Sequence, residues 1–106
     1  SVLVLGITFK ENCPDVRNTK VIDVISHLKT YGMHLTIYDP WANPSEVKSE
    51  YQIDTIKETP KATFDAIVLT VAHNEFIKMD LKPLMKKNTV VYDVKGVLGI
   101  KADAKL

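Results

Sequence analysis

The sequence is poor in the residues that mark disulfide-rich, zinc-binding and membrane-spanning proteins. It has a single cysteine, so an internal disulfide and a cysteine pair for structural zinc are both excluded, and a reducing compartment is expected. Its longest apolar runs, such as residues 66–69, fall far short of the roughly 20 residues that a membrane span requires. We therefore expect a cytoplasmic protein with no membrane partner.

A surplus of charge of one sign is also missing. Lysine and arginine number 14 and aspartate and glutamate 13, so the formal net charge is +1. Proteins that bind nucleic acids carry excess cations that displace phosphate counterions, so we expect no nucleic-acid partner. With 45% hydrophobic and 25% charged residues, the 106-residue chain has the composition and length of one globular domain. Its abrupt start on an apolar run suggests a piece of a longer protein.

What the sequence does contain is a regular alternation of apolar runs and helical periodicity. Continuous apolar runs predict buried strands at residues 2–5, 35–38, 66–71 and 90–94. Helical spacing predicts helices at residues 19–31, 44–49 and from about residue 74, the last one broken near Pro83. Residues 51–63 fit a loop, a short edge strand or both. Alternating strands and helices build βαβ units, so we predict an α/β fold: a three-layer α/β/α Rossmann-like domain with a mostly parallel sheet.

Turn-forming residues mark both ends of the first predicted helix. Asn18 or Thr19 is placed to cap its N-terminus, and Gly32 stands where a left-handed residue ends a helix. Ligands of open parallel sheets bind beyond the carboxyl ends of the strands. In this chain those ends lead into residues 6–18, 39–41, 71–74 and 93–96. Candidate site residues are therefore sought in these segments.

The first of these loops, residues 6–18, combines one glycine with two cations. A dinucleotide-binding fingerprint has three glycines here, so we do not expect the domain to bind a dinucleotide by itself. Lys10 and Arg17 flank the entry to the first long helix, whose N-terminus adds partial positive charge. These features fit an anion site. The alternative, favoured by composition alone, is that both are solvated surface cations paired with Glu11 and Asp15.

The other strand ends carry weaker candidates. Lys95 would project at the ligand edge of the sheet, although a plain strand-terminating turn is an equal alternative. Asp39 stands where dinucleotide folds often bind a ribose, but without the glycine loop a structural cap or turn is favoured. Trp41 then packs over the sheet edge or into an interface. His73 either touches a ligand or belongs to a helix cap formed by Asn74.

Metal and nucleophile chemistry are not expected. The three histidines, His27, His34 and His73, show neither ligand spacing nor a clustered carboxylate, so no metal site is predicted. Cys13 has no histidine near it in the sequence, and a lone loop cysteine is more often inert than catalytic. No residue of this chain is therefore expected to be catalytic.

One segment is more specific than its separate parts: residues 6–19, which read GITFKENCPDVRNT. With Tyr38-Asp39-Pro40 and residues 93–98 following in the same order, it strongly resembles the C-terminal UDP-binding domain of the UDP-glucose/GDP-mannose dehydrogenase family. It is most similar to the branch of UDP-N-acetylhexosamine (UDP-GlcNAc/UDP-GalNAc) 6-dehydrogenases, which serve surface polysaccharide synthesis. The resemblance covers essentially the whole chain. It implies that residues 1–106 are a single UDP-binding domain, a C-terminal fragment of a longer dehydrogenase.

The resemblance implies that different domains of the complete protein bind the cofactor, carry the catalytic cysteine and bind the nucleotide. An N-terminal Rossmann domain would hold NAD, and a central helical domain would carry a catalytic cysteine; both are expected partners in the same chain, in a homodimer or larger assembly. The complete enzyme would oxidise the C6 alcohol of a UDP-sugar to a carboxylate by two hydride transfers, through a thiohemiacetal and a thioester. Cys13 does not match that cysteine, so the fragment alone is expected to be inactive.

The resemblance also implies roles for individual residues. Phe9 and Lys10 match a substrate-contacting Phe-Lys pair, with Lys10 near the UDP diphosphate, and Arg17 matches an arginine that reaches the NAD side. Lys95 is a third expected substrate contact, where glucose-specific members have an arginine pair and this chain has Lys95-Gly96.

Two other functions are weighed against this one. A non-catalytic receiver-like regulatory or interaction module would have similar alternation of strands and helices, but it needs clustered acidic residues after the first strand, and these are missing. A free-standing NAD-binding protein is disfavoured by the single glycine of the first loop.

Overall fold

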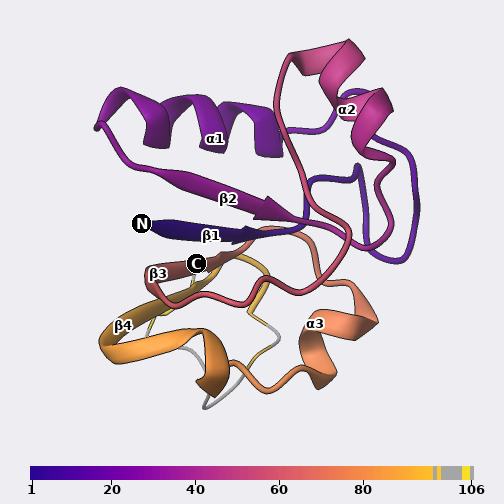
Figure 1. Cartoon of the computed structure of the whole chain (residues 1–106). Coiled ribbons are helices and arrows are strands. Elements are labelled where there is room, and N and C mark those ends of the chain that lie inside the picture. Colours follow the sequence, from indigo (N-terminus) through magenta and orange to yellow (C-terminus); the bar gives the residue numbers. More distant parts are fainter. Residues whose placement is uncertain (97, 99–103, 106) are drawn as a thin grey trace.

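The structure, a computed structural model, describes residues 1–96, 98, 104 and 105. In this part of the chain, five parallel strands form one sheet in the order β2-β1-β3-β4-β5 (Figure 1). The strands are β1 (Val2–Leu5), β2 (Leu35–Tyr38), β3 (Phe64–Leu69), β4 (Met85–Asp93) and β5 (Ala104–Lys105). The helices are α1 (Val21–Thr30), α2 (Pro44–Tyr51), α3 (Asn74–Lys78) and the short 3-10 helix η1 (Lys82–Leu84). The predicted α/β fold with a parallel sheet is confirmed.

Helices cover both faces of the sheet. In Figure 1, α1 and α2 lie on one side of it and α3 on the other. Because successive side chains of a strand point to opposite faces, β1 supplies Val2 and Val4 to the core under α1 and α2, and Leu3 and Leu5 to the opposite core. The helical segments meet them with Val21, Ile25 and Val47 in the first core and with Phe76, Leu81 and Leu84 in the second. The predicted three layers are therefore present.

The first helix begins later than predicted. Its N-cap position is Lys20, so the predicted cap at Asn18 or Thr19 is wrong. Thr19 still supports the helix start, because its hydroxyl accepts the N–H of Val21 at 3.2 Å and donates to the carbonyl of Thr8 at 3.4 Å. The shift leaves Lys20 at the helix entrance.

The other element bounds differ by a few residues. β3 runs from Phe64 to Leu69 rather than over residues 66–71, and β4 already begins at Met85. The helix predicted from residue 74 ends at Lys78, because the next residue has extended backbone. Gly32 has a φ of +72°, which confirms the left-handed residue after α1. None of the helices in the described residues has the length and apolarity needed to cross a bilayer.

Residues 51–63, left open by the sequence, form a loop with one edge pairing. Ile56 makes a parallel bridge to Tyr38 at the end of β2. Its amide donates to the carbonyl of Ile37 at 2.9 Å, and its carbonyl accepts the amide of Asp39 at 3.0 Å. The outer side of the edge strand β2 is thus partly paired, which shields backbone groups that would otherwise stay open.

Gly6 directly follows β1 and brings two loops into contact. Its φ is +103°, and a Cβ at this position would lie 2.5 Å from the Cβ of Val71, so both backbone conformation and space require glycine. The Thr70 hydroxyl lies 3.0 Å from the carbonyl oxygen of Leu5 and 2.6 Å from that of Gly6, and donates toward both. The end of β1 is therefore fastened to the end of β3, which places loop 6–18 at the carboxyl edge of the sheet.

Candidate functional site

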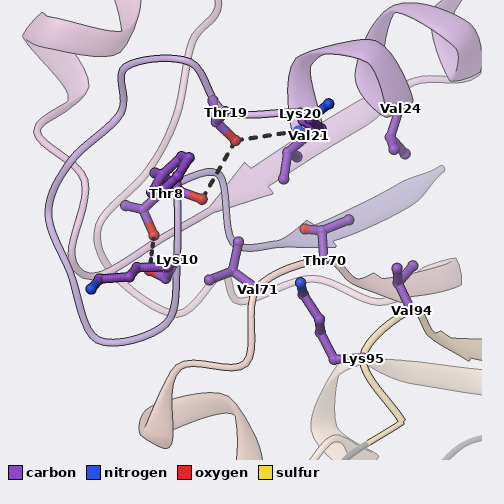
Figure 2. A pocket seen from close by; sticks show the side chains of 11 residues that line it. Thr8, Lys10, Thr19, Lys20, Val21, Val24, Thr70, Val71, Val94 and Lys95 are labelled. Atoms are coloured by element: carbon purple, nitrogen blue, oxygen red, sulfur yellow. Dashed lines mark hydrogen bonds between the residues drawn. The ribbon is translucent and has the colours of Figure 1, made fainter.

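A cleft of about 270 Å³ opens at the carboxyl edge of the sheet, beside the entrance of α1 (Figure 2). Four segments line it: the loop after β1, the start of α1, the turn after β3 and the turn after β4. The lining residues are Thr8, Phe9, Lys10, Thr19, Lys20, Val21, Val24, Thr70, Val71, Val94 and Lys95. This is the edge at which open parallel sheets bind their ligands.

Three lysines surround the cleft, and the described residues that line it include no acidic side chain. Lys10, Lys20 and Lys95 are exposed, and within the described part of the chain no carboxylate pairs with their ammonium groups. In Figure 2 the Lys95 side chain rises toward Thr70, whereas the Lys10 side chain runs away from Lys95. The cleft can attract an anion of at least two charges.

Hydroxyl groups of two threonines make hydrogen bonds that hold the loop segment lining the cleft. The Thr8 hydroxyl donates to the Lys10 carbonyl at 3.0 Å, and the Thr19 hydroxyl donates to the Thr8 carbonyl (Figure 2). Phe9 lies between these residues with 58% of its surface exposed. An exposed ring next to a cationic cleft is suited to packing against a flat base or sugar face.

The turn after β4 is shaped by the carboxylate of Asp93, which is buried. One oxygen accepts the amides of Lys95 and Gly96 at 3.0 and 2.8 Å, and the other accepts the amide of Leu98 at 2.7 Å. Residue 95 therefore belongs to a strand-terminating turn, as the alternative interpretation held, and it also lines the cleft. Val97, within the family-like run 93–98, lies outside the described residues.

Asp39, at the end of β2, has the structural role that the sequence favoured. It is fully buried, and one carboxylate oxygen accepts the amides of Ile7 and Thr8 at 2.7 and 3.2 Å. The other oxygen accepts the amides of Trp41 and Ala42 at 2.8 and 3.2 Å. Burial raises the pKa of this carboxyl, but hydrogen bonds from His73 and the backbone outweigh burial and hold the pKa below its ordinary value.

The position of His73 was not predicted from the sequence, because His73 neither lines the cleft nor lies at the surface. The imidazole is fully buried, with Nε2 3.1 Å from both Asp39 Oδ2 and Thr8 Oγ1. Its Nδ1 accepts the amide of Asn12 at 2.8 Å. Trp41 stacks on the ring at a centroid distance of 5.9 Å, so the tryptophan packs over the sheet edge as expected. The sequence could not show this cluster, because its members are distant along the chain.

The predicted cap at Asn74 is wrong as well. The N-cap position of α3 is His73, which makes no side-chain cap hydrogen bond. The amide of Asn74 instead donates to the side-chain oxygen of Asn12 at 2.9 Å. Both residues of segment 73–74 therefore hold Asn12 of the first loop.

Arg17 lies apart from the other three candidate residues. Its guanidinium pairs with both oxygens of Asp15, at 3.1 and 3.2 Å, and lowers the pKa of that carboxyl. It lines a separate shallow hollow against α2, beside Glu46 and Glu50. The structure thus brings Phe9, Lys10 and Lys95 to one cleft and leaves Arg17 outside it. Lys20, which the sequence did not single out, joins the cleft because α1 starts after it.

In the part of the chain that the structure describes, no three histidine, cysteine or acidic side chains are grouped so that they could share a metal ion. Cys13 is partly buried in loop 6–18 and does not line the cleft.

Comparison with known proteins adds to this geometry. The model of the UDP-glucose/GDP-mannose dehydrogenase family, UDP binding domain, matches residues 3–100. A UDP-N-acetyl-D-glucosamine 6-dehydrogenase from Salmonella typhi is 46% identical over 101 residues, which cover 92% of this chain and 24% of the relative. One from Pseudomonas aeruginosa is 41% identical over 100 residues, with the same coverage. The chain therefore spans about a quarter of the length of these relatives.

Solved structures share the fold. A UDP-glucose dehydrogenase from Pyrobaculum islandicum superimposes with a TM-score of 0.75 at 23% identity, over 98% of this chain and 24% of that one. A UDP-D-ManNAc dehydrogenase from Pyrococcus horikoshii gives a TM-score of 0.72 at 17% identity, with the same coverage. At these identities the likeness supports the fold alone.

Proposed function

Because this chain belongs to the UDP-glucose/GDP-mannose dehydrogenase family, in which it matches the UDP binding domain, we propose that it grips the nucleotide of a UDP-sugar for an NAD-dependent 6-dehydrogenase. The catalytic steps would take place in other domains of a longer chain: an N-terminal NAD-binding domain and a central helical domain. The observation that carries the proposal is the cleft, whose lining among the described residues includes three lysines and no acidic side chain. A sugar diphosphate carries two negative charges that such a cleft would neutralise.

The substrate would be a UDP-N-acetylhexosamine. Two of the relatives at 41% identity or more are named UDP-N-acetyl-D-glucosamine 6-dehydrogenases, which supports this sugar class over glucose. Oxidation of its C6 alcohol to a carboxylate would give a uronic acid for surface polysaccharides, in the cytoplasm. In this arrangement Phe9, Lys10 and Lys95 bind substrate, and Lys20 adds a cation at the α1 entrance.

The first loop does not fit NAD by itself. In dinucleotide-binding folds the loop amides after the first strand face the pyrophosphate. Here the amides of Ile7 and Thr8 are occupied by the buried carboxylate of Asp39. Cofactor binding would therefore belong to the N-terminal domain, with Arg17 reaching it from this domain. The exposure of Arg17 and its place outside the cleft lining support that role. A homodimer or larger assembly is proposed for the complete protein.

A receiver-like module is not favoured. Receiver domains need an accessible carboxylate for phosphorylation, and Asp39, the carboxylate that follows β2, is fully buried with backbone amides on both oxygens. Phosphorylation would have to break these bonds first.

The proposal is tested by titrating the ¹⁵N-labelled chain with UDP-N-acetyl-D-glucosamine and following amide NMR shifts. Shift changes are expected in residues 8–10, 19–21 and 94–95, which lie around the cleft. Lys10→Ala and Lys95→Ala should each weaken binding, and Lys57→Ala, on the remote loop after α2, is the matched control. Shifts confined to other surfaces, or none at millimolar ligand, would contradict the proposal.

A further inference from the structure

Next to the cleft, three buried polar residues, Thr8, Asp39 and His73, form a hydrogen-bonded cluster with the exposed residue Asn12. Of these four residues only Thr8 lines the cleft. The side chain of His73 contacts the first loop at two places, the hydroxyl of Thr8 and the amide of Asn12. Phe9 and Lys10, the proposed ligand contacts, lie between these two points in the sequence.

The hydrogen bonds define which ring nitrogen of His73 carries the proton. Nδ1 faces the amide of Asn12 at 2.8 Å, and because an amide only donates, Nδ1 must be an unprotonated acceptor. Thr8 has one hydroxyl proton, which it donates to the Lys10 carbonyl, so toward the imidazole its oxygen accepts. The Asp39 carboxylate also accepts at Nε2. The neutral ring with its proton on Nε2 therefore satisfies every partner.

The far end of the span that His73 holds, Asn12, is also tied to Asn74. Asn12 has a φ of +54°, a conformation unfavourable for a non-glycine residue, and its side-chain oxygen accepts the amide of Asn74 at 2.9 Å. The amide of Phe9 donates to the carbonyl of Asp15 at 2.7 Å, which closes the loop on itself. Such loop strain persists only when surrounding contacts fix it, and the contacts here come from segment 73–74.

We propose that His73, in its neutral Nε2–H form, is a positioning residue that holds Thr8 and Asn12 and thereby sets Phe9 and Lys10 at the cleft. This role rests on the proposed function, since it matters only if Phe9 and Lys10 bind the nucleotide sugar. His73 itself does not touch the ligand.

Protonation of His73 would break this arrangement. An imidazolium has a proton on both nitrogens, so Nδ1–H would face the N–H of Asn12, and the acceptor for that amide would be lost. The Asp39 carboxylate contacts the ring directly, and Glu75 accepts the indole N–H of Trp41, which stacks on the ring, at 3.0 Å. The other elements packed on the ring supply uncharged Trp41 and Phe76. The positioning role of His73 therefore requires the neutral ring.

Three substitutions of His73 test the contributions of its two ring nitrogens separately. His73→Asn keeps an acceptor close to the position of Nδ1, whereas His73→Gln keeps a polar group close to that of Nε2 and loses the acceptor for Asn12. His73→Phe keeps ring volume and loses both. His27→Asn, on the exposed side of α1, is the control for a change of histidine elsewhere.

The experiment measures affinity for UDP-N-acetyl-D-glucosamine by NMR titration of the whole chain. Wild-type protein, the His27→Asn control and His73→Asn should bind with similar affinity. His73→Gln and His73→Phe should bind about five- to tenfold more weakly, the size expected for one hydrogen bond lost.

A second measurement does not depend on variants that fold. Long-range ¹⁵N–¹H spectra of the wild-type ring should show the Nε2–H form. A ring protonated on Nδ1, or equal affinities of the Asn and Gln variants, would overturn the role of His73 and leave the proposed function standing. Absence of wild-type binding would instead reject the proposed function, and the role of His73 with it.

Discussion

The carboxylate of Asp39 lies 2.7 Å from the backbone nitrogen of Ile7, so the end of β2 fastens the first turn of the loop after β1. In dinucleotide folds the corresponding amides face a ligand, and here they face a buried side chain. Buried Asp39 and His73 therefore hold the backbone of the loop after β1, whereas the lysines around the cleft stay exposed. The residues that support the loop and the residues proposed to bind the ligand thus lie on opposite sides of this loop.

Replacement of Asp39 by asparagine is expected to destabilise the fold by about 2–4 kcal/mol, because the new NH₂ group must face amide donors in a buried site. The free energy of unfolding in urea measures the effect. Asp54→Asn is the matched control, since the side chain of Asp54 is 90% exposed and pairs with the exposed Lys48; its change should stay within about 0.5 kcal/mol. Equal losses in both variants would contradict the role given to Asp39.

The stability provided by Asp39 should also depend on pH. The folded-state pKa of this carboxyl is lowered, so its contribution is complete above the unfolded-state pKa and is lost as the pH falls toward the folded value. The difference in unfolding free energy between wild type and Asp39→Asn should therefore be constant from about pH 7 to about pH 5 and shrink below about pH 4. Urea midpoints measured across this range test the sign, and a difference that grows on acidification would refute it.

Features that depend on short stretches of sequence could be predicted from the sequence. Buried apolar runs predicted β1 and β2 with their observed bounds, and the strand-end rule brought Lys10 and Lys95 to one cleft. The start of α1 was missed by one or two residues, because Thr19 makes its hydrogen bond from just before the N-cap. That small error hid Lys20, whose place at the cleft depends on where the helix begins.

The hydrogen bonds by which His73 holds the loop after β1 could not be predicted from the sequence, for a different reason. Asn12 and His73 are 61 residues apart, and their hydrogen bond exists only once β1 and β3 pair side by side. Nothing in the neighbourhood of His73 in the sequence distinguishes a buried acceptor from a surface histidine. Arg17 and Lys10 posed the opposite problem: seven positions apart in one loop, they face different hollows because the chain folds back at residues 9–15.

The three cleft lysines should each contribute to nucleotide-sugar binding. Lys10→Ala, Lys20→Ala and Lys95→Ala are expected to weaken UDP-N-acetyl-D-glucosamine binding by about tenfold each, since each removes a charge-assisted contact. The slope of affinity against salt concentration should fall in the same variants, because fewer charges meet the ligand. Calorimetry or NMR titration at two salt concentrations measures both. A Lys20 variant with wild-type affinity and slope would remove Lys20 from the site.

Arg17→Ala should leave the affinity of the chain for the same ligand within about twofold, because Arg17 lies outside the cleft lining. In the complete dehydrogenase the proposed cofactor role predicts a KM for NAD raised about three- to tenfold, with little change in the KM for the UDP-sugar. Steady-state kinetics with each substrate varied in turn separate the two. An effect on the UDP-sugar alone would place Arg17 in the substrate site instead.

Gly6→Ala should destabilise the fold by about 2–5 kcal/mol, the sum of a positive φ and an overfilled contact. Its new Cβ would lie 2.5 Å from the Cβ of Val71, at a φ of +103°. Gly32→Ala is the matched control, because Gly32 also has a positive φ, +72°, but open space around it, so only the backbone cost of about 1–2 kcal/mol applies. Val71→Gly in the Gly6→Ala background removes the opposing Cβ. If steric contact with Val71 accounts for the excess over Gly32→Ala, the second change should cost less there than in wild type, and additive costs in urea unfolding would disprove that contact.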